Sequence, residues 1–114
     1  MNIEEFREYC LSKKDVTECF PFDDVTLVFK VKGKMFALTN TDEEFSVNLK
    51  CDPEKAIELR EHFSSVQPGY HMDKKHWNTI IPDTSLTDEL LKKWTDDSYE
   101  LVVKKLPKSA KKPL

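Results

Sequence analysis

Aromatic and hydrogen-bonding side chains are concentrated in residues 70–78, with the sequence YHMDKKHWN. Such a group in one loop and strand suits a small anionic ligand, because the rings supply apolar contact and the phenol, imidazole and amide groups supply hydrogen bonds. The alternative is that the rings fill the edge of a sheet while histidine and asparagine bond loop carbonyls. The residue types leave both interpretations open. The candidate pocket residues are Tyr70, His71, His76, Trp77 and Asn78.

Lysines are grouped at two predicted turns and near the end of the chain. A basic hairpin tip at residues 32–34 could lie along a phosphate backbone as a wing, and residues 74–77 place two lysines where a tryptophan could pack against a sugar or base. The last fourteen residues add five lysines and no acid. Against this interpretation, the net charge is −3, and lysines at hairpin turns also protect sheet edges. The candidate nucleic-acid contacts are Lys32, Lys34, Lys74, Lys75, His76 and Trp77.

The first quarter of the chain is acidic, with seven carboxylates against three bases up to Asp24. Glu4, Glu5 and Glu8 belong to a predicted first helix. Such an acidic ridge could bind a hard cation or a basic partner. The simpler interpretation, which we favour, is a solvated helix face whose first-turn carboxylates are stabilised by the helix dipole.

Other candidates for metal binding or catalysis lack the required spacing. The histidines, at 62, 71 and 76, and the cysteines, at 10, 19 and 51, form no zinc-ligand pattern. Two glycines cannot build a phosphate-binding loop, and no G-x-S-x-G motif marks a nucleophile. The sequence therefore predicts no metal, no cofactor and no enzymatic activity.

The cysteine count and the chain start bear on the compartment. Three cysteines cannot form a complete disulfide framework, so we expect reduced thiols and a cytoplasmic protein. Cys10 and Cys51 fall on predicted apolar faces, where a thiol packs as a small hydrophobe. The start, MNIEEFREYC, lacks the basic and apolar regions of a secretion signal, and no apolar run approaches the roughly 20 residues of a membrane helix.

Hydrophobic periodicity predicts the elements that must position these residues. Asn2 caps a first helix with an apolar face of Ile3, Phe6 and Cys10, and Asp52 with Pro53 begins a second helix. Alternating apolar residues predict strands at 25–31 and 45–51, a hairpin return predicts one at 35–39, and HWNTII, ended by Pro82, predicts a fourth at 76–81. A capping box at Ser85 and a new start at 96–98 predict two final helices, while 15–24 and 64–75 are expected to be irregular.

This order predicts an α+β fold, an antiparallel sheet with helices packed on one face. At 114 residues, 39% hydrophobic and 11% aromatic, the chain is long enough for one domain with a real core. We expect that domain to span residues 1–107, followed by a basic tail at 108–114.

Five segments in order resemble the MmcQ/YjbR-like family of small bacterial proteins. The longest match is PGYHMDKKHWNTII at 68–81. The other segments are FPFD at 20–23, VFKVKGKMFAL at 28–38, SVNLKCDPEKAIELRE at 46–61 and SYELVVKKLPK at 98–108. The resemblance implies a frataxin-like α+β sandwich and a DNA-binding role through two wings, the turn at 32–34 and the loop ending at 74–77. By fold analogy alone it also suggests cation binding at the acidic first helix.

Together these inferences predict a monomeric, non-enzymatic binding protein. Its expected partner is DNA, contacted by lysine ammonium groups that displace counterions from phosphates. The alternative is a small-ligand or metal-binding protein that uses the 70–78 pocket or the acidic first helix.

Overall fold

The computed structural model of this protein describes residues 1–69 and 72–107. Its elements are α1 (Ile3–Leu11), β1 (Val16–Cys19), β2 (Thr26–Val31), β3 (Lys34–Asn40), β4 (Val47–Lys50), α2 (Pro53–His62), β5 (Val66–Pro68), β6 (Trp77–Ile80) and α3 (Asp88–Lys104). The strands form one sheet in the order β1-β2-β3-β4-β6-β5, and every neighbouring pair is antiparallel. Within the described ranges, the helices are too short or too polar to cross a membrane.

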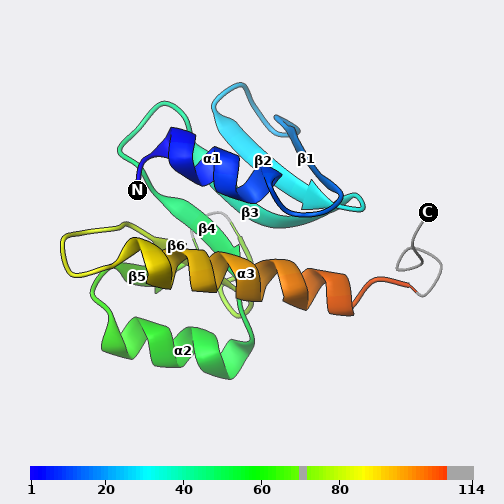
Figure 1. Cartoon of the computed structure of the whole chain (residues 1–114). Helices are drawn as coiled ribbons and strands as arrows, with labels where there is room; N and C mark the ends of the chain where they lie inside the picture. Colours follow the sequence, from blue (N-terminus) through cyan, green and yellow to red (C-terminus); the bar gives the residue numbers. More distant parts are fainter. Residues whose placement is uncertain (70–71, 108–114) are drawn as a thin grey trace.

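The three helices cover one face of this sheet, which confirms the predicted α+β class. Phe6 of α1, Leu59 of α2 and Trp94 of α3 all belong to one buried cluster with the inward-facing strand residues. Figure 1 shows α3 running across the sheet, with α1 and α2 on either side of it. A smaller cluster on the opposite face contains Val28, Leu38 and Trp77. The sheet therefore has one thickly covered face and one thinly covered face.

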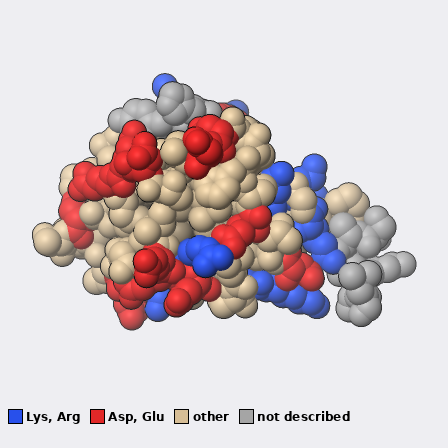
Figure 2. All heavy atoms as spheres, turned by 90° about the horizontal axis from the view of Figure 1, so that it is seen from above, with Lys and Arg blue, Asp and Glu red and all other residues tan. Residues whose placement is uncertain are grey.

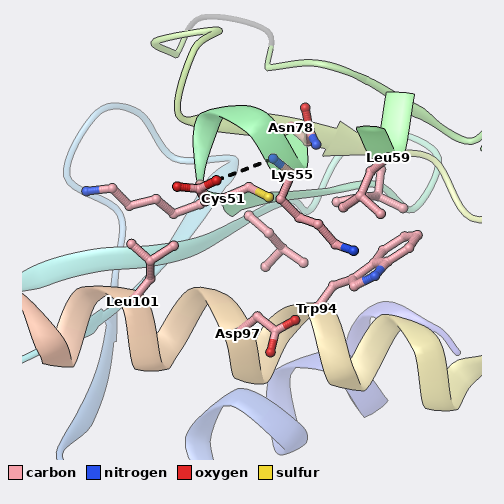
Figure 3. A pocket seen from close by; sticks show the side chains of 11 residues that line it. Cys51, Lys55, Leu59, Asn78, Trp94, Asp97 and Leu101 are labelled. Atoms are coloured by element: carbon pink, nitrogen blue, oxygen red, sulfur yellow. Dashed lines mark hydrogen bonds between the residues drawn. The ribbon is translucent and has the colours of Figure 1, made fainter. Parts of the chain in front are cut away.

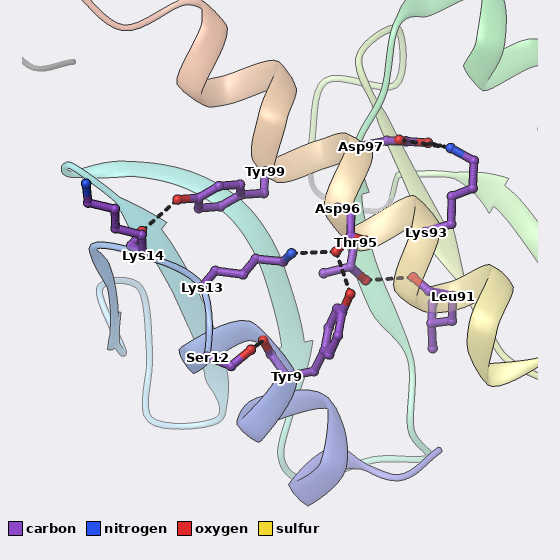
Figure 4. Close-up of polar contacts among 10 residues, drawn as sticks. All are labelled: Tyr9, Ser12, Lys13, Lys14, Leu91, Lys93, Thr95, Asp96, Asp97 and Tyr99. Carbon is purple, nitrogen blue, oxygen red and sulfur yellow. Dashed lines mark hydrogen bonds and ion pairs between the residues drawn. The ribbon is translucent and has the colours of Figure 1, made fainter. Parts of the chain in front are cut away.

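The helix α1 is fastened to α3 by polar contacts as well as by apolar packing. The Tyr9 hydroxyl donates to Asp96 Oδ1 at 2.6 Å, and the Lys13 ammonium pairs with the same oxygen (Figure 4). Burial and the Asp96 carboxylate raise the pKa of Tyr9 to about 12, which keeps the phenol protonated and donating. Further along α3, the Tyr99 hydroxyl donates to the Lys14 carbonyl at 2.7 Å.

Two short edge strands differ from the prediction of irregular structure. Val16–Cys19 pairs with β2, and Val66–Pro68 pairs with β6. Each has four residues or fewer, which is too short for a clear alternation, and Pro68 is tolerated because β5 is an edge strand. The prediction that these segments are entirely irregular was therefore wrong.

The last helix is continuous, whereas the sequence predicted two. Its N-cap is Thr87, whose side chain accepts from the Leu90 amide, so the predicted capping box at Ser85 was wrong. The second start was inferred from the polar residues at 96–98. These side chains make tertiary or i,i+4 contacts: Asp97 pairs with Lys93, and Ser98 reaches the sheet. None of them is left to cap a new helix.

Gly69 allows β5 to approach β6 closely. Its amide donates to the Trp77 carbonyl at 2.9 Å, and an added Cβ would lie 2.9 Å from Trp77 Cβ and 3.0 Å from that carbonyl oxygen. We expect Gly69→Ala to lower the free energy of unfolding by about 1–3 kcal/mol, because a strand backbone must shift. Urea denaturation measures this. The exposed Ser64→Ala is the control, with an expected change within about 0.5 kcal/mol. Greater stability in Gly69→Ala, the usual entropic effect of this change, would contradict the contact.

Candidate functional site

The β2–β3 turn presents two lysines at one end of the sheet. Lys32 and Gly33 both have positive φ, at 51° and 82°, and form a two-residue loop within the hairpin turn predicted at 32–34, because Lys34 already pairs with Val31. The Lys32 ammonium lies 3.5 Å from Asp15 Oδ2, which partly neutralises it. Lys34 is exposed and makes no ion pair with any described residue. This turn and the C-terminal end of α3 lie at the same end of the molecule (Figure 1).

Lys50 lies near three other charged side chains, those of Lys105, Asp73 and Lys34. Its backbone amide at the end of β4 donates to Ser98 Oγ at 2.9 Å, which fixes the position of the lysine. Partial burial lowers the pKa of Lys50, and the nearby ammonium groups of Lys105 and Lys34 lower it further, while Asp73 acts in the opposite direction. Lys34 of β3 and Lys105 at the end of α3 are thus both near enough to Lys50 of β4 for their charges to act on it.

We call Lys34, Lys50 and Lys105 the basic end. Neither Lys50 nor Lys105 forms an ion pair within residues 1–69 and 72–107, and the same holds for Lys34. Figure 2 shows most of the blue basic atoms of the viewed face gathered toward the right, with a further blue group near the middle, while red acidic atoms form separate groups, most of them on the left and along the lower edge. The charge of this acidic protein is therefore unevenly distributed, with a positive end that retains unneutralised ammonium groups.

The second predicted wing, the loop ending at 74–77, is held in place by polar contacts. His76 Nδ1 lies 2.5 Å from Asp73 Oδ2, and this hydrogen bond is the main reason that the pKa of Asp73 falls below its usual value. Arg60 of α2 donates to the Lys74 carbonyl and to Asn78 Oδ1, the latter at 2.6 Å. The side chains of Lys74 and Lys75 remain exposed. Asp73 is close enough to Lys50 to affect its pKa, so this loop borders the basic end.

The predicted 70–78 pocket is not assembled by its described members. Trp77 and Asn78 are adjacent in β6 and point to opposite faces of the sheet. The indole is 6% exposed and packs against Val28 and Leu38, whereas the Asn78 amide on the helical face donates to the Ala56 carbonyl and accepts from Arg60. His76 lies at the surface with Asp73. Tyr70 and His71 lie outside the described residues.

The burial of Trp77 also bears on the expected DNA contacts. With 6% of its surface exposed, the indole has no free face on which a base or sugar could stack. Of the six residues predicted from the sequence to contact DNA, the lysines therefore remain as the candidates for electrostatic contacts with phosphates. Lys50 and Lys105 were absent from that set, although both lie in segments on which the family resemblance rested.

The acidic first helix does not assemble a recognisable metal site. Glu5 Oε1 accepts from the Asn2 amide in a capping box, as expected for a first-turn carboxylate. Among the residues that the structure describes, no group of three or more histidine, cysteine, aspartate or glutamate side chains could hold a metal ion. Cys10 is fully buried, and Cys51 is half-buried on the helical side of the sheet.

An antiparallel sheet with helices on one face and a lysine-rich end defines a small α+β protein with a polarised surface. The YjbR family model matches residues 11–101. The uncharacterized protein YbdF of Escherichia coli O157:H7 is 36% identical over 110 residues, covering 96% of this chain and 90% of the relative. The uncharacterized protein YjbR of Escherichia coli K12 is 35% identical over 115 residues, covering 100% and 98%. This chain belongs to the YjbR family.

Solved structures agree with this assignment. A crystal structure of the Deinococcus radiodurans protein DR2400, described with the domain DUF419, has a TM-score of 0.89 and 42% identity, covering 96% of this chain and 84% of that one. A crystal structure from Pseudomonas syringae has a TM-score of 0.76 and 28% identity, covering 89% and 98%. The family resemblance and the α+β fold class inferred from the sequence are thus confirmed.

Proposed function

We propose that this protein binds DNA through the basic end, without enzymatic activity, as a cytoplasmic monomer. The proposal rests on the position of the β2–β3 turn and the end of α3 at one end of the molecule, where the charges of Lys34 and Lys105 act on Lys50. These residues are far apart in sequence, and among the described residues none of them has an ion-pair partner. Like charges held together raise one another's energy, so the arrangement favours an anion that lies between them.

The family segments support the same surface. Four of the five segments that resemble the family each contribute one residue to this region: Lys34, Lys50, Asp73 and Lys105. The exposed Lys74 and Lys75 extend it toward the second wing. A role that depends on this end of the molecule would account for the placement of these otherwise separate segments.

The chemistry of these contacts favours recognition of the DNA phosphate backbone. Lysine ammonium groups act as point charges toward phosphate oxygens and release condensed counterions, which gives affinity without sequence preference. A phosphate beside Lys50 would also offset the repulsion from its two lysine neighbours. Since the tryptophan of the second wing is buried, base stacking adds little, and we expect similar affinity for duplexes of different sequence.

Fluorescence anisotropy with a labelled duplex tests the proposal. We expect binding at low salt that weakens as salt rises, with a slope of log K against log salt of about −0.9 for each phosphate neutralised, or about −2.7 for three. Two duplexes of unrelated sequence should give the same curve. No change in anisotropy up to about 100 μM protein at low salt, the weak limit of non-specific binding, would refute DNA binding.

A further inference from the structure

A cleft of about 300 Å³ lies between α2 and α3 on the helical side of the sheet (Figure 3). It arises because α2 packs chiefly against β5, while α3 packs against β3 and β4, so the two helices leave part of β4 and β6 uncovered between them. The apolar residues that line it are Leu49, Cys51, Leu59, Ile80, Trp94 and Leu101. Its size is at the lower end of the range for small-molecule sites.

The interior of the cleft is apolar, and the charged residues in its lining are Lys50, Asp52, Lys55 and Asp97. The other two polar residues of the wall, Asn78 and Cys51, offer an anion no charge. Asn78 has both ends of its amide occupied, accepting from Arg60 at 2.6 Å and donating to the Ala56 carbonyl at 3.3 Å. Burial raises the pKa of Cys51 to about 11, so its thiol is protonated at neutral pH. Water in such a space finds few partners, and an apolar group that replaces it gains the free energy of removing apolar surface from water.

The mouth of the cleft carries an ammonium group that can bind an anion. Lys55 extends from α2 over the opening, opposite Asp97 of α3 (Figure 3). Both oxygens of Asp97 face the Lys93 ammonium, at 3.3 and 3.4 Å. Lys55 itself pairs with Glu58 at 3.8 Å, and both side chains are about half exposed, so this contact is weak.

The Asp52 carboxylate is the N-cap of α2 and accepts from the Lys55 backbone amide at 3.4 Å. Lys50, which also lines the cleft, forms no ion pair with a described residue. Both carboxylates of the lining thus have partners, which leaves the Lys55 and Lys50 ammonium groups for an anionic ligand.

We propose that this cleft binds a small organic carboxylate, with its apolar chain or ring in the interior and its carboxylate on Lys55. The apolar walls select the body of the ligand, and the ammonium group selects the sign of its head group. Lys50 of the basic end also borders this cleft, but the proposal depends on Lys55 and the apolar walls and does not require DNA binding.

Alkylation of Cys51 by N-ethylmaleimide, followed by peptide mass spectrometry, tests the cleft in the full chain. Octanoate, octan-1-ol and octylamine serve as probes because they share one apolar chain and differ in head group. We expect octanoate to protect Cys51 at about tenfold lower concentration than octan-1-ol or octylamine, since one charge-assisted hydrogen bond contributes about that factor. Cys19, which packs on the opposite face of the sheet, is the internal control and should react at an unchanged rate.

Two variants distinguish binding of the apolar chain in the cleft from binding of the head group by Lys55. Lys55→Gln should remove the preference for octanoate and leave protection by octan-1-ol unchanged, whereas Lys92→Gln should leave both unchanged. Leu101→Trp, which fills the cleft, should abolish protection by every probe, with circular dichroism confirming the fold. Absence of protection by all three probes at millimolar concentration, or equal protection of Cys19, would refute the site. Equal potency of the three head groups, or stronger protection by octylamine, would refute the carboxylate assignment.

Discussion

Replacing Ser98 by alanine is expected to lower the free energy of unfolding by about 3 kcal/mol. The Ser98 hydroxyl is fully buried, accepts from the Lys50 amide at 2.9 Å and donates to the Phe36 carbonyl at 2.5 Å. Phe36 and Lys50 lie just beyond the last β3–β4 ladder pair, Ala37 with Leu49, so the hydroxyl bridges the two strands where direct pairing ends. The alanine variant leaves a buried donor and a buried acceptor unpaired, each at a cost of about 1–3 kcal/mol.

A buried hydroxyl one turn earlier in α3 is the matched control. The Thr95 hydroxyl donates only to the Leu91 carbonyl within the same helix, at 2.8 Å. Thr95→Val keeps the shape and removes a bond whose acceptor also belongs to the helix ladder, so we expect a loss below about 1 kcal/mol. Urea unfolding of both variants gives the comparison. Equal losses in the two variants would show that the strand bridge has no special role.

The triple variant Lys34→Gln, Lys50→Gln and Lys105→Gln is expected to weaken DNA binding roughly 100-fold at low salt. Each substitution removes one ammonium group from the basic end, so the slope of log K against log salt should become shallower by about 0.9 for each phosphate that is no longer neutralised. The weakening should be the same for duplexes of different sequence, because phosphate contacts carry no sequence information. Anisotropy titrations at several salt concentrations measure both quantities.

A second triple variant controls for net charge. Lys55→Gln, Lys92→Gln and Lys93→Gln also remove three positive charges, but from α2 and the first half of α3. There Lys55 pairs with Glu58 and Lys93 pairs with Asp97. We expect less than a threefold change in affinity from this variant, about the effect of a distant charge under screening. If both triples weaken binding equally, net charge and not the basic end governs the interaction.

Much of the fold could be predicted from the sequence because its signals are local. The alternation at 25–31, the turn at 32–34 and the apolar run at 35–39 predicted the β2–β3 hairpin, and Lys32 and Gly33 have the positive φ that a two-residue loop requires. Asp52 with Pro53 predicted the start of α2, and the observed helix begins at Pro53 with Asp52 as its cap. Periodicity alone could not show the short edge strands, which exist because β2 and β6 offer them an open edge.

The candidate site was less predictable, since it depends on contacts between distant residues. The lysines of the two turns were identified from composition, but Lys50 looked like an ordinary outward residue of a strand. Its significance appears only when α3 brings Lys105 beside β3 and β4. The period-two rule already places Trp77 and Asn78 on opposite faces of a strand, and applying it would have removed their shared pocket.

The fold class, the family and the lysine-rich turns of this acidic chain were predictable from local sequence patterns, because periodicity, capping residues and short motifs depend on neighbours in the chain. Which charges lie near one another, on which face of the sheet each of the two buried tryptophans packs and where the helices leave a cleft depend on the tertiary structure. These features depend on side chains brought together over tens of residues, and the direction of each side chain is set by the surface that packs against it.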